Sequence, residues 1–155
     1  MREQRPSMQS AIEIVPFVAS MQQSVSKLIT EGLVEHWGFN DPEKNPDLVD
    51  IASSYGRSSF FVALYETLIV GTGAIVEEAE QGGRIVRMSV SRQHRRLGVG
   101  AAILQHLEQE GKQRGYTNIT LETTEGWADA TSFYLSQGYE VTGCRDSEVH
   151  FIKLI

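Results

Sequence analysis

The sequence is poor in cysteine and in long apolar runs, and each scarcity excludes a class of protein. Cys144 is the single cysteine among 155 residues, so no disulfide can form within the chain, and a reducing, cytoplasmic setting is the simplest expectation. No apolar run approaches the roughly 20 residues of a membrane-spanning helix. The polar start, MREQRPSMQS, lacks the apolar middle of a secretory signal. We therefore expect no association with a membrane.

An excess of basic residues is also absent. The chain has 14 Lys and Arg against 20 Asp and Glu, which gives a formal net charge of −6. A protein that binds nucleic acid usually presents a basic face, so we expect no nucleic-acid partner. RNA binding through the local arginines at residues 92–96 is the alternative, and it predicts a steep salt dependence. The acidic balance suits either a cationic partner or plain solubility.

The chain does have enough apolar material for a core, since 41% of its residues are hydrophobic. Its length predicts a single domain over residues 1–155, with about the first ten residues flexible. Alternation and helical spacing predict, in order, a strand (11–18), a helix (19–30), a mixed loop (32–59) with a short helix (46–55), three strands (60–65, 68–77, 84–90), a helix (98–114), a strand (117–123), a helix (128–137) and two strands (139–144, 148–155).

This order predicts how the strands pair. A helical crossover joins residues 84–90 to residues 117–123, so these two strands should be parallel. The three strands before the crossover form an antiparallel meander, in which Gly71 and Gly73 indicate a bulge or a close backbone approach. The pattern is typical of an α/β (α+β) fold with a mixed, largely antiparallel central sheet flanked by helices.

The segment SVSRQHRRLGVGAAILQHLEQEGKQRG, residues 89–115, carries the strongest chemical signal. A strand meets a cluster of cations and two glycines, and an amphipathic helix follows at once. The first amides of a helix have no partner inside it, and the helix dipole adds roughly half a positive charge there. Glycines let a bulky anion approach, and arginines add charge-assisted hydrogen bonds. The pattern predicts a pyrophosphate cradle formed by Arg95, Arg96, Leu97, Gly98, Val99, Gly100 and Ala101.

Other nucleotide-binding loops share this logic but differ in sequence. A P-loop needs Gly-Lys-Ser/Thr, and here Gly100 is followed by two alanines. A dinucleotide fingerprint needs a third glycine where Ile103 stands, although Glu122 lies at the distance of its ribose-binding acid. The preceding strands are expected to be antiparallel, so a doubly wound sheet does not fit. A plain strand–helix turn with surface arginines is the remaining alternative.

Two motifs carry a resemblance to a known family. The spacing Arg95-x-x-Gly98-x-Gly100 resembles the Q/R-x-x-G-x-G/A signature of the GNAT superfamily of acetyltransferases. The match extends through the helix and the next strand, from residue 94 to residue 122. ADATSFYLSQGYE, residues 128–140, is similar to the following helix of that family, in which A-x-x-x-Y-x-x-x-G-F/Y recurs. The resemblance is strong over residues 84–140.

The resemblance implies a single-domain GNAT fold whose parallel strands, residues 84–90 and 117–123, splay apart to hold acetyl-CoA as the co-substrate. It implies that the pantetheine arm pairs with the backbone of Met88, Ser89 and Val90, and that an amide near Met88 faces the thioester oxygen. It implies no metal ion.

The resemblance also suggests proton carriers for the reaction. Tyr134 stands at the family's usual position for the general acid, and its alternative role is that of a core aromatic. Glu122 stands twelve residues before it, as the base does in ribosomal-protein N-terminal acetyltransferases, and its alternative role is that of a solvated strand residue. Trp127 occupies a place where family members often carry an Asn that binds the cofactor arm, which leaves that contact open.

The acceptor is the least specified part. The segment EHWGFNDPEKNPD combines aromatic side chains with four carboxylates, Glu35, Asp41, Glu43 and Asp47, and this mixture suits a cationic amine, although an acidic surface loop would look the same. We expect a small amine or an amino acid as the acceptor. The alternatives are a protein N-terminus or lysine, and a non-catalytic module that binds acetyl-CoA. A homodimer is possible.

Overall fold

The computed structural model describes residues 11–56, 59–79 and 81–155. The expectation that about the first ten residues are flexible concerns residues outside this part. The strands are β1 (Ile12–Pro16), β2 (Phe60–Tyr65), β3 (Leu68–Glu78), β4 (Gly82–Val90), β5 (Asn118–Thr124), β6 (Glu140–Arg145) and β7 (Glu148–Leu154), and the α-helices are α1 (Gln22–Trp37), α2 (Ile51–Tyr55), α3 (Val99–Gln113) and α4 (Ala128–Ser136). No helix within these residues is long and apolar enough to cross a bilayer.

The described strands form one seven-stranded sheet in the order β1-β2-β3-β4-β5-β7-β6. Strand β4 pairs with β5 in parallel, through Gly82–Arg84 opposite Asn118–Thr120. The pairs β1/β2, β2/β3, β5/β7 and β6/β7 are antiparallel. The prediction of a mixed, mostly antiparallel sheet with one parallel pair, joined by a helical crossover, is therefore confirmed.

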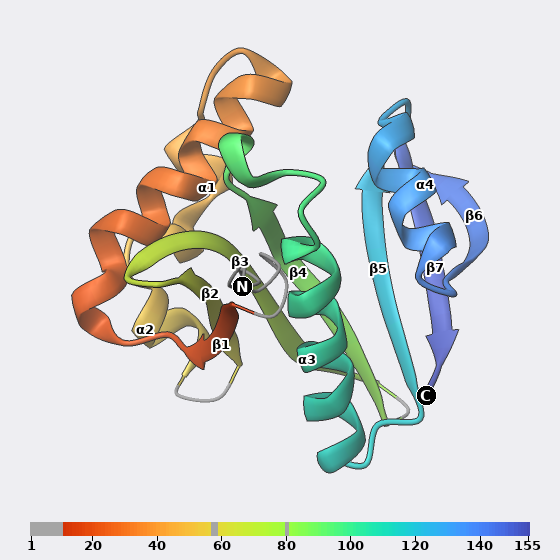
Figure 1. Ribbon diagram of the computed structural model, residues 1–155. Helices are drawn as coiled ribbons and strands as arrows, with labels where there is room; N and C mark the ends of the chain where they lie inside the picture. Colours follow the sequence, from red (N-terminus) through yellow and green to blue (C-terminus); the bar gives the residue numbers. More distant parts are fainter. Residues whose placement is uncertain (1–10, 57–58, 80) are drawn as a thin grey trace, which may run out of the picture. The chain divides into compact units, whose positions relative to one another are not determined.

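The chain divides into two compact units, to which β3, β4 and α3 each contribute residues on both sides of the division. The first unit comprises the described residues up to Ala74 together with Arg87–His106. Its helices α1 and α2 lie beside β1–β3 (Figure 1). The ring of Phe60, which is fully buried, meets those of Phe17 and Tyr55 at centroid distances of 5.6 and 5.1 Å. This aromatic contact joins β2 to the segments on either side of α1.

The second unit comprises Ile75–Val86 and Leu107–Ile155. In it, α4 lies in front of β7 (Figure 1). The ring of Tyr134 on α4 packs against Phe151 on β7 and against Tyr139, with centroid distances of 5.8 and 5.9 Å. Leu121 of β5 is buried and lies opposite Phe151 in the antiparallel register. The core of this unit is thus built on the face of the strands that α4 covers.

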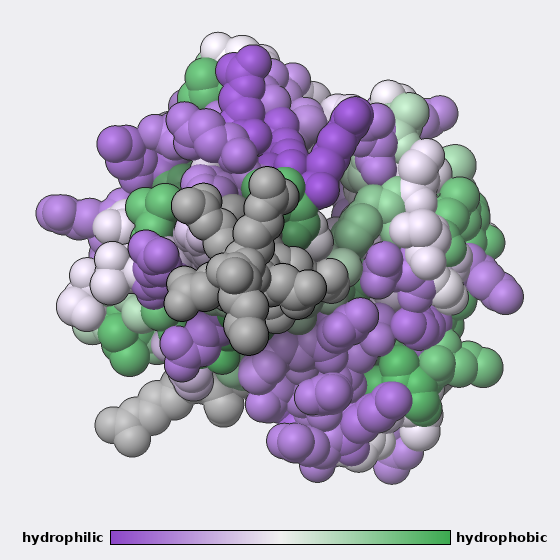
Figure 2. Space-filling model, viewed as in Figure 1, coloured by the Kyte–Doolittle hydropathy of each residue, from purple (hydrophilic) through white to green (hydrophobic). Residues whose placement is uncertain are grey.

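Helix α3 has the amphipathic pattern expected from its sequence. Ile103, Leu104 and Leu107 are fully buried, whereas Gln105 and Gln109 are exposed. Hydrophilic residues accordingly cover the outer side of this helix in the space-filling view (Figure 2). The helix stops where the sequence predicts, because Gly115 adopts a left-handed conformation with φ of 82°.

The region before β2 differs from the prediction. The helix expected over residues 19–30 continues to Trp37, so the first part of the expected loop is helical. Gly32 lowers the helical propensity there, yet it does not end the helix; a Cβ on it would make an ordinary contact of 3.4 Å with the Ser89 hydroxyl. The helix ends at Gly38, whose φ is 79°. The short helix expected over residues 46–55 is a 3-10 turn, Pro46–Leu48, followed by α2.

Candidate functional site

The turn from β4 into α3 gathers the residues of the predicted cradle in the first unit. The turn contains two residues with positive φ, Arg96 at 63° and Gly98 at 86°. The first intrahelical bond after them joins the Ala102 amide to the Gly98 carbonyl, at 3.0 Å. The amides of Val99, Gly100 and Ala101 therefore open the helix with no acceptor inside it. This is the donor arrangement that an anion needs at a helix N-terminus.

Close packing against β3 holds the start of α3 in place. A Cβ on Gly71 would lie 2.7 Å from Ile103 Cδ1, 2.9 Å from Val99 Cγ1 and 3.1 Å from the Ser89 carbonyl oxygen. A side chain at this position would force Ile103 or Val99 to shift, so glycine suits the close approach of the helix. The expectation of a close backbone approach at Gly71 is confirmed. The end of the helix that carries the free amides is thus packed closely against β3.

Arg95, which the sequence places among the phosphate ligands, is engaged with α1. Its Nη1 and Nη2 donate to the two carboxylate oxygens of Glu35, at 2.5 and 2.7 Å. The hydrogen bond from Arg95 lowers the pKa of the Glu35 carboxyl and, reciprocally, raises the pKa of Arg95. Arg95 and Arg96 are both exposed at the surface before the start of the helix. The structure therefore directs the charge of Arg95 toward Glu35.

A cavity of about 360 Å³ lies where α1 approaches the end of β4. Its walls include Gly32 and Glu35 from α1, and Val90, Ser91 and Arg95 from the other side. The C-terminal end of β4 and the Arg95–Glu35 pair therefore both line this cavity in the first unit.

The last three residues of β4 are Met88, Ser89 and Val90, which are predicted to pair with the pantetheine arm. They follow an irregularity in the strand, because Arg87 has a φ of 56°. The Thr72 hydroxyl on β3 donates to the carbonyl oxygen of Arg87 at 2.8 Å, and Thr72 is fully buried. The strand is therefore bent and held at the residue just before the predicted contacts.

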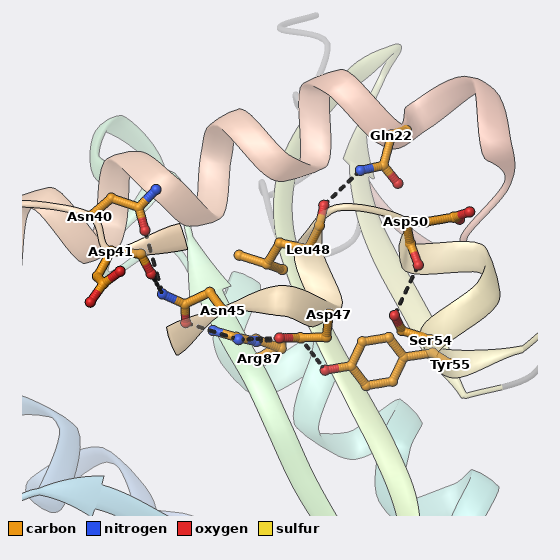
Figure 3. A network of polar contacts seen from close by, with 10 residues as sticks. All are labelled: Gln22, Asn40, Asp41, Asn45, Asp47, Leu48, Asp50, Ser54, Tyr55 and Arg87. Atoms are coloured by element: carbon orange, nitrogen blue, oxygen red, sulfur yellow. Dashed lines mark hydrogen bonds and ion pairs between the residues drawn. The ribbon is translucent and has the colours of Figure 1, made fainter. Parts of the chain in front are cut away.

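The side chain of Arg87 is the centre of a polar network (Figure 3). Its Nε and Nη2 donate to the two carboxylate oxygens of Asp47 at 2.8 and 2.6 Å, and Nη2 also donates to Asn45 Oδ1 at 3.0 Å. The Tyr55 hydroxyl donates to Asp47 at 2.5 Å. Burial acts to raise the pKa of Asp47, but the bonds from Arg87 and Tyr55 outweigh it and lower the pKa. Asp47 is thus a charged, fully engaged group.

Tyr134, the predicted acid, lies in the second unit and is buried, with 7% of its surface exposed. Its ring packs among Phe133, Tyr139 and Phe151. Burial raises the pKa of its hydroxyl above the ordinary range. The packing agrees with the role of a core aromatic, and the neutral phenol also suits a hydrogen-bond donor.

Glu122, the predicted base, is on β5 in the same unit, but on the other face of the strands. Leu121 and Thr123 beside it are buried, as strand alternation requires. Its Oε2 accepts a hydrogen bond of 3.0 Å from Arg84 Nε, and its Oε1 lies 3.9 Å from His150 Nδ1. Because Tyr134 packs on the face that carries Leu121, the structure does not bring Glu122 and Tyr134 into contact.

Sequence reasoning missed His150 as a neighbour of Glu122. The two residues are directly opposite in the antiparallel β5/β7 register. Strands β5 and β7 are not joined by a hairpin turn, because α4 and β6 lie between them in the chain. No local turn therefore sets their register, and the sequence alone did not reveal the pair. Across the residues that the structure describes, no group of three or more His, Cys, Asp or Glu residues is arranged to hold a metal ion.

Relatives among curated proteins share this sequence over about two thirds of the chain. N-acetyltransferase 8F1 of Rattus norvegicus is 35% identical over 106 residues, which cover 64% of this chain and 48% of the relative. The probable N-acetyltransferase 14 of Xenopus tropicalis is 36% identical over 105 residues, covering 64% and 50%. The aligned part thus spans about half the length of these curated relatives.

Solved structures share the fold over nearly the whole chain. An acetyltransferase of the GNAT family from Staphylococcus aureus Mu50 superposes with a TM-score of 0.83 at 21% identity, covering 93% of this chain and 99% of its own. The PaiA N-acetyltransferase of Thermoplasma acidophilum, solved in complex with coenzyme A, gives 0.76 at 15% identity, covering 93% and 99%. The sequence pattern of the acetyltransferase (GNAT) family matches residues 26–139. This match covers well over half of the chain, and the chain belongs to the acetyltransferase (GNAT) family.

Proposed function

We propose that the chain is an N-acetyltransferase that moves the acetyl group of acetyl-CoA to a primary amine. The observation that carries the proposal is the start of α3, where three amides follow the positive-φ residues Arg96 and Gly98. These donors fit a diphosphate, because they are backbone groups without a helical acceptor and lie next to glycine. CoA supplies such a diphosphate, and its acetyl thioester supplies an activated acyl group.

In the proposed reaction the amine nitrogen attacks the thioester carbon, so a C–N bond forms and the C–S bond breaks. The amine loses a proton to a base or to water, and the departing thiolate gains one. An alkyl ammonium with a pKa near 10.4 is mostly protonated at pH 7, which disfavours the attack by about 4 to 5 kcal/mol unless a proton path exists. The backbone of Met88–Val90 is assigned to the pantetheine arm, and the Met88 amide to the carbonyl oxygen as negative charge develops there.

We assign to Tyr134 the role of hydrogen-bond donor to the departing sulfur. Its raised pKa keeps the phenol protonated over the whole physiological range. Complete proton transfer from such a phenol to a thiolate whose conjugate acid has a pKa of about 8.5 runs uphill. Burial therefore favours a hydrogen bond from the Tyr134 hydroxyl to the developing thiolate. The thiolate finally takes its proton from this hydroxyl or from water.

We assign to Glu122 the removal of the proton from the attacking amine. Arg84 occupies one carboxylate oxygen and orients the group, while the other oxygen lies on the side of His150. An imidazole next to a carboxylate is itself a competent proton carrier near neutral pH. The proposal keeps Glu122 as the base and makes His150 the first group to test against it.

We propose a small amine or an amino acid as the acceptor, with a peptide amine as the alternative. Trp37 and Phe39 are 51% and 61% exposed, and with Asp41 they line a cavity of about 220 Å³ after α1. Aromatic faces beside a carboxylate suit a cationic group. Glu35 and Asp47 already have arginine partners, and Asp41 is the carboxylate that lines this cavity, so the proposal assigns Asp41 to the acceptor.

A panel of acceptors tests the proposal. Polyamines, amino acids, amino sugars and peptides with a free N-terminus are each mixed with the chain and acetyl-CoA, and the released CoA thiol is measured. Release of thiol that depends on one acceptor class, and that falls in a Tyr134→Phe variant, supports the transferase. Saturable binding of acetyl-CoA with no thiol release by any acceptor would instead identify a non-catalytic acetyl-CoA-binding module.

A further inference from the structure

Arg87 adopts a backbone conformation that a long side chain rarely takes. Its φ of 56° lies inside strand β4, where the neighbouring residues are extended. The left-handed region is unfavourable for residues that carry a Cβ, so such a residue persists only where its surroundings hold it. The contacts of Arg87 therefore need an explanation beyond ordinary strand pairing.

One contact holds the peptide that joins Arg87 to Met88. The Thr72 hydroxyl donates to the Arg87 carbonyl oxygen at 2.8 Å. A trans peptide is planar, so the N–H of Met88 points away from the carbonyl oxygen of Arg87. Fixing the carbonyl toward Thr72 thus fixes the Met88 amide in the opposite direction, away from β3.

The second set of contacts holds the side chain. Asn45 and Asp47 accept hydrogen bonds from the guanidinium, and the Tyr55 hydroxyl donates to Asp47 (Figure 3); we call these three residues the Arg87 clamp. The side chains of Arg87 and Asp47 are only 19% and 24% exposed, so water screens the pair little.

The clamp is itself anchored to the long helix α1. Gln22 Nε2 donates to the Leu48 carbonyl oxygen at 2.8 Å, and Gln22 Oε1 accepts from the Ile51 amide at 3.0 Å. These bonds flank Asp47 on its C-terminal side. On the other side, Asn45 Nδ2 donates to the Asp41 carbonyl oxygen at 3.0 Å. The segment that is proposed to bind the acceptor is therefore connected by hydrogen bonds to Arg87, where β4 bends.

We propose that Asp47 is a positioning residue for acetyl transfer, which holds Arg87 in its left-handed conformation and thereby directs the Met88 amide at the thioester oxygen. This inference rests on the proposed function. It also gives Asp47 a role different from that of an acceptor ligand, because both of its carboxylate oxygens are already occupied by Arg87 and Tyr55. A consequence is that a shift of the Asn45–Tyr55 segment on acceptor binding would change the direction of the Met88 amide.

Kinetics of two variants test the positioning role. Asp47→Ala should lower kcat at least tenfold, with the KM of the acceptor and the Kd of acetyl-CoA changed less than threefold. Asp50→Ala is the matched control, since Asp50 caps α2 nearby through Ser53 and has no contact with Arg87. It should lower thermal stability similarly and leave kcat within twofold. Equal loss of kcat in both variants, or a rise in acceptor KM with kcat unchanged in Asp47→Ala, overturns the inference.

A rescue variant separates positioning from acceptor binding. Glycine adopts a positive φ without steric cost. When Arg87→Gly is added to Asp47→Ala, the double variant should therefore have a kcat at least threefold higher than that of Asp47→Ala alone. If Asp47 contacted the acceptor, removal of Arg87 would restore nothing, and that result overturns the inference.

A measurement without turnover keeps this test separate from that of the proposed function. NMR couplings that report the φ of residue 87 should give a positive value in the wild-type chain and an extended value in Asp47→Ala, with the Met88 amide signal shifted. An unchanged φ and an unchanged Met88 signal overturn the inference even when the enzyme is active. Absence of wild-type turnover would contradict the proposed function. The couplings would still decide whether Asp47 holds the left-handed φ of Arg87.

Discussion

Arg95 and Glu35 form a bidentate ion pair that joins the turn before α3 to helix α1. Their side chains are 38% and 31% exposed, so the pair is accessible to water and to a competing anion. A diphosphate on the amides of α3 would lie on the same turn as this guanidinium. Arg95 can contribute to phosphate binding only to the extent that Glu35 releases it.

We predict that Glu35→Gln strengthens acetyl-CoA binding. Removal of the carboxylate frees Arg95 for the phosphates, and the Kd should fall roughly threefold to tenfold, equivalent to about 0.7–1.4 kcal/mol. Calorimetric titration measures the change. Glu31→Gln, one helical turn earlier, removes an exposed carboxylate that pairs only distantly with Lys27, at 4.0 Å, and should leave the Kd unchanged. Weaker binding by Glu35→Gln would show that Glu35 orients Arg95 instead of competing for it.

The left-handed glycine in the turn gives a second prediction. Gly98→Ala places a Cβ on a residue with φ of 86°, which should cost about 1–2 kcal/mol of stability and weaken acetyl-CoA binding tenfold or more. Gly115→Ala is a matched control at the other end of α3, with φ of 82° and no atom within 4 Å of the added Cβ. It should lose similar stability and keep its Kd. Equal Kd values for both variants would contradict a cradle at Gly98.

Tyr134→Phe should lower kcat about tenfold to a hundredfold, because the thiolate loses a donor. The Kd of acetyl-CoA should stay within twofold. Since burial raises the pKa of Tyr134, the wild-type rate should show no loss from ionisation of this phenol between about pH 9 and 10, where ordinary tyrosines begin to ionise. A kcat unchanged by the substitution would leave Tyr134 as a core residue only.

Tyr139→Phe provides the comparison for that variant. Tyr139 is buried beside Tyr134 and donates to Glu108 at 3.1 Å, so the substitution removes a buried hydroxyl of the same kind. We expect a small loss of stability and a kcat within twofold of the wild type.

The two candidate bases can be separated by single substitutions. Glu122→Gln keeps the shape of the side chain and should lower kcat/KM about a hundredfold, measured under conditions where acetyl-CoA is saturating. His150→Gln should lower it less than threefold if His150 is only a neighbour. The reverse order would assign the proton to His150 and leave Glu122 as the group that orients it.

Stability should depend on pH through Asp47. Its folded-state pKa is lowered, so the native state binds fewer protons than the unfolded state, and the stabilisation is present above the ordinary pKa of about 4. It is lost as the pH falls through the lowered value. Asp47→Asn should reduce the free energy of unfolding by about 1–3 kcal/mol at pH 7, and by less as the pH falls below 4. Urea unfolding at pH 7, 5 and 3 measures this. A difference that is constant with pH would contradict the ion pair.

Local features of the fold follow from the sequence because they depend on local rules. The helix of residues 99–113 has its apolar spacing and its terminal glycines in the chain itself. The face on which Glu122 lies follows from alternation beside two buried residues. The cradle is local in the same sense, since helix, turn and glycines are consecutive.

Features that depend on partners distant in sequence could not be predicted. Arg95 is bound by Glu35, 60 residues earlier, and Arg87 by Asp47, 40 residues earlier. No spacing rule joins them, because the helix and loop before β2 must first be placed. The positive φ of Arg87 has no signal in its own residue type, which is why a regular strand was expected there. Helix α1 passes the predicted boundary at Gly32 and ends only at Gly38, where the backbone turns left-handed.

The most direct test of the central claim is a calorimetric titration of the wild-type chain with acetyl-CoA at two salt concentrations. The account predicts saturable binding at one site per chain, which weakens as salt rises and is accompanied by thermal protection. Absence of both heat and thermal protection would contradict the claim that the start of α3 receives a diphosphate.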